Sequence, residues 1–354
     1  MHMRFIKQLV PLALVGLACL APAAQAAEKL KIAIIGGTGD IPFYLADAKG
    51  WFAQEGLEVE MITFDSGARM IAPMASGDID VGTGAVAAGL YNAFEREITI
   101  RIVADKGRNV KGMSFQGLMV RKALVESGAV RKVADLKGRK MAFTGPGAND
   151  SAVIDEAARQ AGFTFNDIES VYLGLGAQLA AYQNGAIDAS IMPEPFRTNV
   201  MKTGAAVELL PVADLRDDDQ TGVVMYSDSL IRKRPEVAAK LMKLYIRAAR
   251  YYNDSLKGGK IAGANADEII DVMAKYSSLK DKDALRAIVP SAIDADGRPS
   301  LDSLRADLEF YKAQGLVKSA ITVDQAVDMS WVERAVKELG PYKAKYRNIQ
   351  EDRK

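Results

Sequence analysis

The chain has 354 residues, of which 26% are charged and 49% are hydrophobic, an ordinary composition for a folded protein larger than one minimal domain. This composition excludes a disordered chain, collagen and a disulfide scaffold. The 46 lysines and arginines nearly balance the 45 aspartates and glutamates, so the chain lacks the basic excess that neutralises a phosphate backbone. We therefore expect no nucleic-acid partner.

The first 26 residues have the pattern of a cleaved secretory signal peptide. Arg4 and Lys7 precede an apolar run over residues 9–20, and the small residues of a cleavage site follow at 24–26. The run is short for a membrane anchor, and the residues before Cys19 are a poor signal for lipid attachment, so a lipoprotein is the lesser alternative. We expect cleavage after Ala26 and a location in the periplasm.

His2 and Cys19 are the only histidine and cysteine of the chain, so the mature protein expected from this cleavage has neither. It therefore has no Ser-His-Asp or Cys-His nucleophile, no histidine base, and no thiolate or imidazole zinc site. We expect no catalytic residue, no metal site and no cofactor, and hence a protein that is not an enzyme.

From Leu30 onward, apolar strands alternate with helices. Strands are predicted at 30–35, 57–64, 79–81 and 98–104, and helices at 41–54, 68–75 and 86–94. Such alternation predicts an α/β fold in which a mostly parallel sheet carries helices on both faces. Residues 82–87 fit a dinucleotide-binding pattern, but the strand before them is very short, and a tight turn into a helix is the favoured explanation of their glycines.

After residue 116 the same order of elements begins again. Gly36 and Gly67 correspond to Gly145 and Gly176, each 109 residues later, and residues 76–81 are echoed at 184–189. The repeat predicts two similar lobes, with crossings between them at 117–120 and 222–226. From Pro235 the pattern changes to helices, which we assign to the outside of the first lobe and expect at 235–256, 266–276, 281–288, 301–314 and 323–339.

The predicted organisation is therefore a signal peptide at 1–26, a first lobe formed by 27–116 plus 227–354, and a second lobe at 117–226. Open α/β sheets bind ligands at the carboxyl ends of their strands, so the glycine-containing loops of the two lobes should face each other across a cleft.

Several loop residues have side chains or backbone suited to a ligand. The 144–151 loop offers free N–H groups at a helix start, and Arg69 could clamp an oxyanion, whereas Asp40 and Glu194 would accept hydrogen bonds. Lys106, Arg108 and Lys111 are expected to form a basic loop. The candidate ligand-binding residues are Gly37, Thr38, Asp40, Pro42, Phe43, Ser66, Arg69, Thr83, Gly84, Thr144, Gly145, Gly147, Asn149, Gly176, Glu194 and Phe196.

Four segments resemble a known family. Residues 41–59, with Lys49-Gly50-Trp51-Phe52 and Glu55-Gly56-Leu57-Glu58-Val59, resemble the opening of ABC-transporter substrate-binding proteins of the nitrate, sulfonate and taurine type, which are related to the thiamine-pyrimidine group. The Gly77 to Gly82 turn, the 136–140 segment and the Met192 to Phe196 turn match as well. The resemblance covers roughly residues 28–230.

This resemblance implies a two-lobed type II periplasmic binding protein fold, monomeric, whose hinge closes over one small solute and which delivers that solute to an ABC permease in the inner membrane. The residues favour a sulfonate, carboxylate or related anion, with alkanesulfonate, taurine, aromatic carboxylate and pyrimidine left open. Three alternatives also remain: a thiamine-pyrimidine-type binding protein, a synthase-like enzyme of the same group, whose members use a histidine and pyridoxal, and a ligand-sensing module for a membrane receptor.

Overall fold

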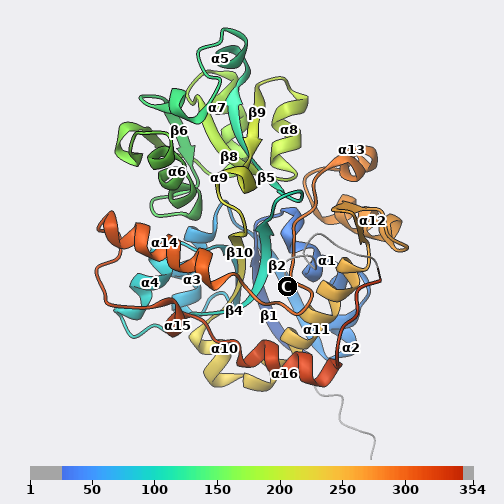
Figure 1. Ribbon diagram of the computed structural model, residues 1–354. Helices are drawn as coiled ribbons and strands as arrows, with labels where there is room; N and C mark the ends of the chain where they lie inside the picture. Colours follow the sequence, from blue (N-terminus) through green and yellow to red (C-terminus); the bar gives the residue numbers. More distant parts are fainter. Residues whose placement is uncertain (1–25, 346–354) are drawn as a thin grey trace, which may run out of the picture.

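The computed structural model describes residues 26–345, which form two lobes, each built on a five-stranded sheet (Figure 1). The predicted signal peptide lies outside the described residues, apart from Ala26. Across residues 26–345, no helix combines the length and the apolar composition needed to cross a membrane.

The first lobe contains a mixed sheet in the order β2-β1-β3-β10-β4. β1 runs parallel to β2 and β3, whereas β10 runs antiparallel to both β3 and β4. The strands are β1 (Glu28–Ile34), β2 (Leu57–Thr63), β3 (Val81–Ala85), β4 (Arg101–Asn109) and β10 (Asp219–Tyr226).

The second lobe repeats this plan in the order β7-β6-β8-β5-β9, with β6 parallel to β7 and β8 and with β5 antiparallel to β8 and β9. Its strands are β5 (Gln116–Arg121), β6 (Lys140–Phe143), β7 (Glu169–Tyr172), β8 (Ala189–Pro193) and β9 (Ala206–Pro211). The prediction of mostly parallel sheets is confirmed, and one strand of each sheet runs against the other four. β5 and β10 each enter their sheet from the side of the other lobe, so they run against the parallel strands.

The crossings between the lobes also differ from their predicted positions. The segments 117–120 and 222–226 lie within β5 and β10, and the connections that join the lobes are residues 110–115 and 212–218. Because β10 hydrogen-bonds to β3 and β4, its residues belong to the first sheet, not to the second lobe in which the sequence placed them.

The sequence repeat has a structural counterpart at two aspartates. Asp80 Oδ2 accepts a hydrogen bond from the N–H of Lys31 at 2.9 Å, and Asp188 Oδ2 accepts one from the N–H of Lys140 at 3.1 Å. Asp80 also pairs with Arg234, as Asp188 does with an arginine at the end of β5. Asp80 therefore ties the start of β3 to β1, and Asp188 ties the start of β8 to β6.

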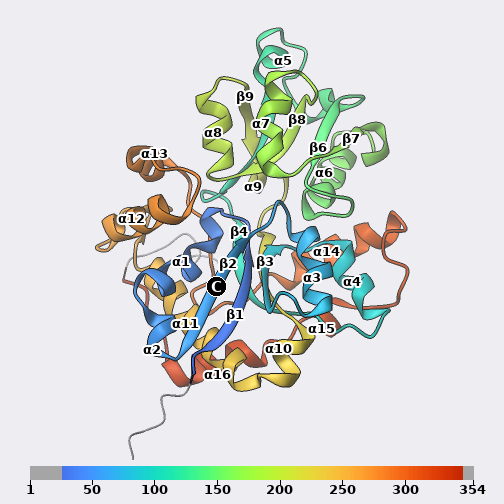
Figure 2. The same cartoon turned by 180° about the vertical axis from the view of Figure 1, so that it is seen from behind.

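Helices cover both faces of the first sheet (Figure 2). One face packs against α1 (Ile41–Ala48), α2 (Trp51–Gln54), α11 (Pro235–Asn253), α12 (Ala266–Tyr276) and α16 (Ser330–Leu339). The other packs against α3 (Ile71–Ser76), α4 (Ala88–Phe94), α14 (Leu301–Ala313) and α15 (Val323–Ala326). The remaining elements of this lobe are α10 (Asp228–Lys233), α13 (Lys282–Ala287) and the hairpin of β11 (Leu256–Lys257) and β12 (Lys260–Ile261).

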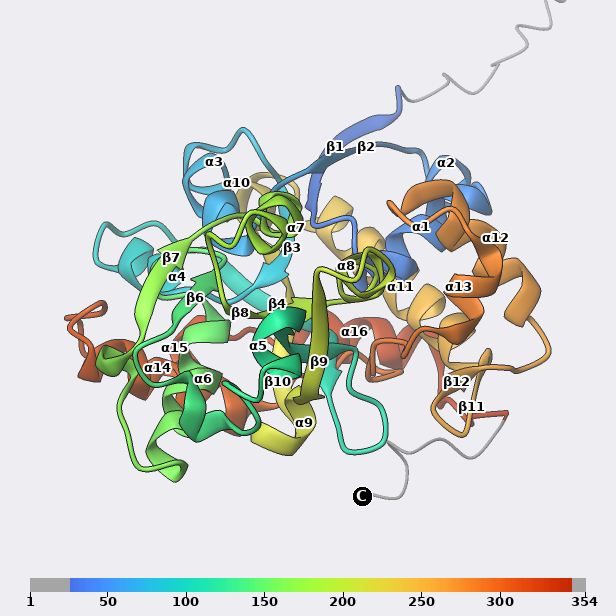
Figure 3. The same ribbon diagram turned by 90° about the horizontal axis from the view of Figure 1, so that it is seen from above.

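The second sheet is covered on one face by α6 (Asn149–Gln160) and α9 (Val212–Leu215) and on the other by α7 (Leu175–Gln183) and α8 (Phe196–Lys202). α5 (Lys122–Glu126) lies at the far end of this lobe (Figure 1). Short 3-10 helices occur at Thr38–Asp40, Gly67–Met70, Val133–Leu136 and Phe165–Asp167. α6 lies against α14 of the first lobe, so the two lobes touch directly (Figures 1 and 3).

Two predicted helices are each broken into two. The helix predicted at 41–54 ends before Gly50, which takes a left-handed φ of 66° between α1 and α2. The helix predicted at 323–339 is interrupted where Val327 and Asp328 pair with Ile102 of β4. In both places a local backbone constraint overrides the helical periodicity.

The glycines at 82–84 lie in β3, not in the turn that the sequence predicts. A Cβ on Gly84 would lie 2.5 Å from the Cα of Gly67, and a Cβ on Gly67 would lie 2.2 Å from the carbonyl oxygen of Ala85. These glycines therefore allow the 67–70 segment to cross directly over β3. The predicted basic loop is likewise strand in part, because Lys106 and Arg108 lie in β4 and only Lys111 lies in a crossing.

Gly84→Ala is expected to destabilise the protein by about 2 kcal/mol or more, because the new methyl group collides with the backbone of Gly67. Gly89→Ala on α4 is the matched control, since its Cβ would meet only Ile71, at 3.9 Å. Urea denaturation of the two variants checks this prediction. Equal stability of both variants would contradict the close approach of the 67–70 segment to β3.

Candidate functional site

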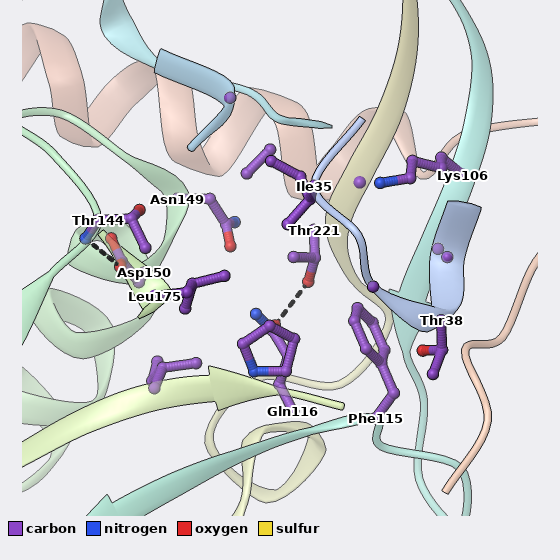
Figure 4. A pocket seen from close by; sticks show the side chains of 18 of the residues that line it. Ile35, Thr38, Lys106, Phe115, Gln116, Thr144, Asn149, Asp150, Leu175 and Thr221 are labelled. Carbon is purple, nitrogen blue, oxygen red and sulfur yellow. Dashed lines mark hydrogen bonds between the residues drawn. The ribbon is translucent and has the colours of Figure 1, made fainter. Parts of the chain in front are cut away.

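A cavity of about 80 Å³ lies between the lobes, at the carboxyl ends of the parallel strands. Both lobes contribute to its wall: Thr38 and Lys106 from the first, Thr144 and Asp150 from the second, with Gln116 beside the crossings (Figure 4).

Six of the sixteen candidate residues line this cavity: Gly37, Thr38, Ser66, Thr144, Asn149 and Glu194. The structure therefore brings together predicted loops from both lobes, around one space. Which of these residues touch a ligand remains a prediction.

Asp40 and Thr83 lie in a buried cluster next to the cavity and do not line it. Lys106 Nζ lies 2.7 Å from Asp40 Oδ1 and donates to the carbonyl oxygen of Thr83 at 2.6 Å. The Thr83 hydroxyl donates to the same carboxylate oxygen at 2.8 Å. Lys106 lines the cavity, and its positive charge is neutralised by the ion pair with Asp40.

Arg69, which the sequence suggests as an oxyanion clamp, lies outside the cavity lining. Its side chain is 67% exposed, and its Nη1 donates to Asp65 at 3.2 Å. The 3-10 geometry of the 67–70 segment places Gly67 toward the cavity and Arg69 toward solvent.

Pro42 and Phe43 are core residues of α1, where the Phe43 ring packs at 5.0 Å from that of Tyr245. Gly84 is buried in β3 beneath Gly67, which itself lines the cavity. None of these three candidates reaches the cavity, because each is used for packing within the first lobe.

Gly145 and Gly147 lie where the lobes touch. A Cβ on Gly145 would lie 3.5 Å from Ala68, and the carbonyl oxygen of Gly147 accepts a hydrogen bond from the N–H of Ala88 at 2.9 Å. The last two candidates, Gly176 and Phe196, line a separate hollow, which shares Ile35 and Leu175 with the main cavity.

Sequence reasoning missed several lining residues, among them Gln116, Thr221, Leu175 and Asp150. Asp150 lies within the 144–151 loop, which the sequence predicts to bind a ligand, so it could have been identified as a candidate from the sequence. Gln116 and Thr221 were not recognisable from the sequence, because they meet only where the starts of β5 and β10, which belong to different sheets, come together at the crossings.

Gln116 is held rigidly at the junction of the crossings. Its Oε1 accepts hydrogen bonds from Asn109 Nδ2 at 2.7 Å and from the Thr221 hydroxyl at 2.8 Å. Asn109 also donates to Asp219 at 3.0 Å. Since its oxygen is engaged in this way, the amide nitrogen of Gln116 is the group it offers to the cavity (Figure 4).

A buried ion cluster lies beside this junction and joins the lobes. Arg216 Nη2 donates to Asp219 Oδ1 at 2.6 Å and to Asp307 Oδ1 at 2.7 Å. Asn149, which lines the cavity, donates to Asp307 Oδ2 at 2.9 Å. The cavity wall in α6 is therefore hydrogen-bonded to α14 of the opposite lobe.

Two carboxylates line the cavity. Burial raises the pKa of Asp150 to about 6, against the opposing effect of a hydrogen bond that its Oδ2 accepts from the Thr144 N–H at 2.9 Å. Burial also raises the pKa of Glu194, although the N–H of Thr198 and the Arg197 guanidinium oppose the shift. No cluster of three or more metal-ligating side chains occurs within residues 26–345.

Comparison with known families places the fold among proteins of known type. A family model described as NMT1/THI5 like matches residues 38–255. Two solved structures share the two-lobed architecture: the alkanesulfonate-binding protein SsuA of Xanthomonas axonopodis bound to MOPS, and the periplasmic nitrate-binding protein NrtA of Synechocystis. SsuA has a TM-score of 0.68 and 19% identity, and the match covers 87% of this chain and 100% of that one. NrtA has a TM-score of 0.70 and 16% identity, and the match covers 89% and 90%. The predicted periplasmic binding protein fold is confirmed.

Three curated proteins share sequence with the chain. An Escherichia coli K12 protein named for binding aliphatic sulfonates is 28% identical over 222 residues, 61% of this chain and 66% of that protein. The taurine-binding periplasmic protein of the same organism is 27% identical over 246 residues, 67% and 71%. A 4-amino-5-hydroxymethyl-2-methylpyrimidine phosphate synthase of Aspergillus parasiticus is 28% identical over 231 residues, 59% and 62%. The chain spans slightly less than two thirds of the first and third of these relatives.

Asp150→Asn is expected to stabilise the protein at pH 7.5 by on the order of 2 kcal/mol. The folded pKa of about 6 lies above the ordinary value of 3.8, so the charged carboxylate weakens the fold above pH 6. This cost disappears as the pH falls from 6 toward 4, and the variant and the wild type should then converge. Urea denaturation at pH 7.5 and 4.5 tests this, and a difference independent of pH would contradict it.

Proposed function

The chain belongs to the NMT1/THI5-like family, and from this premise we propose that it is the extracytoplasmic solute-binding component of an ABC importer. In this role it captures a small organic solute between its lobes and delivers the solute to a permease in the inner membrane. The relatives named for binding sulfonates and taurine support the proposal.

The observation that carries the proposal is the position of the cavity. It lies between two lobes that are joined only by the crossings at 110–115 and 212–218 and by contacts across the cleft. A solute held there contacts both lobes at once, so it binds the closed arrangement more tightly than an open one. Solute binding and lobe closure are therefore thermodynamically coupled.

The solute is proposed to be a sulfonate, a carboxylate or a related anion, as the sequence favours. Arg69 does not contribute to this preference, because it lies outside the cavity lining. The donors that support it are Lys106, whose third N–H is free of the bonds to Asp40 and Thr83, and the amide nitrogen of Gln116. The apolar wall of Phe115, Leu175 and Ile191 suits an organic body more than a bare inorganic ion.

A second candidate function is suggested by the similarity to the pyrimidine phosphate synthase. The family resemblance implies that the synthases of this group use a histidine, and the single histidine of this chain is His2, within the predicted signal peptide. We therefore favour binding without catalysis, by a monomer that is exported to the periplasm.

A thermal-shift screen tests the proposed function. Protein that has been unfolded and refolded, to remove any solute from the host, is heated with alkanesulfonates, taurine, aromatic carboxylates, pyrimidines, amino acids and nitrate. A bound solute at 100 times its Kd adds about 2.7 kcal/mol to the free energy of unfolding, so one class should raise the Tm clearly. A flat response to the whole panel would contradict the proposal.

A further inference from the structure

Asp40 and Asp150 hold corresponding positions in the two lobes. Each follows the first parallel strand of its sheet, β1 or β6, and each uses Oδ2 to accept backbone N–H groups at the end of that strand. Asp40 accepts from residues 35, 36 and 37 at 3.2, 2.9 and 3.1 Å, and Asp150 accepts from Thr144 at 2.9 Å. The two aspartates therefore secure equivalent loops.

The second carboxylate oxygen is satisfied in the first lobe only. Asp40 Oδ1 lies 2.7 Å from the ammonium of Lys106 and accepts the Thr83 hydroxyl at 2.8 Å. The Lys106 ammonium neutralises the buried Asp40 carboxylate, and the Thr83 hydroxyl donates a further hydrogen bond to the same oxygen. A buried charge requires such partners.

In the second lobe the corresponding oxygen, Asp150 Oδ1, is buried and has no hydrogen-bond partner among residues 26–345. The register of the sheets shows why. Gly82 pairs with Ala33, as Ser190 pairs with Ala142, so the counterpart of Thr83 is Ile191, which has no hydrogen-bonding side chain. Asp150 is 7% exposed and lines the cavity, as Ile191 does.

A second unpartnered group lies on the opposite wall. The hydroxyl oxygen of Ser66, a residue only 4% exposed, has no hydrogen-bond partner within the described part of the chain, and Ser66 lines the cavity from the first lobe. The segments that carry Ser66 and Asp150 adjoin each other, because a Cβ on Gly145 would lie 3.5 Å from Ala68.

The charges around Asp150 do not supply the missing partner. Among the described residues, Lys106 is the only cation of the cavity lining; it is paired with Asp40 and lies at the other end of the cavity from Asp150 (Figure 4). Glu194, the remaining charged lining residue, is itself acidic. Behind the wall, Arg216 is engaged by Asp219 and Asp307.

We infer that Asp150, together with the Ser66 hydroxyl, forms a subsite for a protonated amine of the solute. The ammonium group of the solute occupies in the second lobe the place that Lys106 occupies in the first. This inference rests on the proposed function and extends it. The solute is amphoteric, with an amine at the Asp150 end of the cavity and an acceptor group toward Lys106 and Gln116.

The test uses pairs of compounds that differ in the amine: taurine and ethanesulfonate, β-alanine and propionate, benzylamine and benzyl alcohol. Their affinities for the refolded protein are measured by isothermal titration calorimetry at pH 7.5. The amine of at least one pair is expected to bind at least tenfold more tightly than its partner compound, because only the amine pairs with Asp150.

Asp150→Asn keeps an oxygen for the Thr144 N–H and removes the charge. This variant should lose at least tenfold in affinity for the amine and less than threefold for its partner compound. Asp155→Asn is the matched control, since Asp155 lies farther along α6, outside the cavity lining, and pairs with Arg159. Its affinities should equal those of the wild type, and urea denaturation shows whether both variants fold.

The outcomes separate the two proposals. Equal binding of both members of every pair, or an unchanged amine preference in a folded Asp150→Asn variant, overturns the amine subsite and leaves solute binding standing. The subsite is supported if the wild type and Asp155→Asn bind an amine more tightly than its partner compound and only Asp150→Asn loses this preference. Failure of the wild type to bind any of the six compounds overturns the subsite, and the wider thermal-shift panel then decides the proposed function separately.

Discussion

The buried guanidinium of Arg216 holds together the region where the two lobes meet. It lies in the second crossing and pairs with Asp219 at the start of β10 and with Asp307 in α14, while Asn149 of the second lobe donates to the same two aspartates. An unpaired charge in such a place costs several kcal/mol, so these groups have to stay paired or regain water when the lobes separate. These ionic and hydrogen-bonding contacts therefore join the two lobes where they meet. The cavity wall in α6 is hydrogen-bonded to the cluster through Asn149.

The two lobes share a plan, yet their sides of the cavity differ chemically. In the first lobe, Lys106 neutralises the Asp40 carboxylate, so this side presents a neutral ion pair. One N–H of the Lys106 ammonium is not used by Asp40 or Thr83 and can donate to a solute. In the second lobe, Asp150 Oδ1 has no hydrogen-bond partner within residues 26–345, and the position equivalent to Thr83 is occupied by Ile191, which has no hydroxyl group. A duplicated fold thus places a donor at one end of a cavity and an acceptor at the other, which suits a solute whose own ends differ in the same way.

The repeat, most helices and the two-lobed plan could be predicted from the sequence, because they depend on local periodicity and on capping glycines; α12 has the predicted bounds. The direction of β5 and β10 could not, since it follows from the path of the chain between lobes. Local pattern also misplaced Gly84 and Arg69. The first serves the close approach of two segments, and the second is turned outward by a 3-10 helix. The loops that the sequence predicted as ligand-binding supplied six lining residues. Gln116 and Thr221 could not be predicted, because they lie at the starts of β5 and β10, in different sheets, and meet only through the path of the crossings.

Small-angle X-ray scattering of the refolded protein, recorded without solute and with a saturating solute from the binding screen, tests most directly whether the cavity between the lobes is a closing site. Capture between lobes joined by two crossings predicts a smaller radius of gyration at saturation, with one solute bound per chain. A radius that stays the same while calorimetry shows the protein saturated would contradict capture by closure of the lobes.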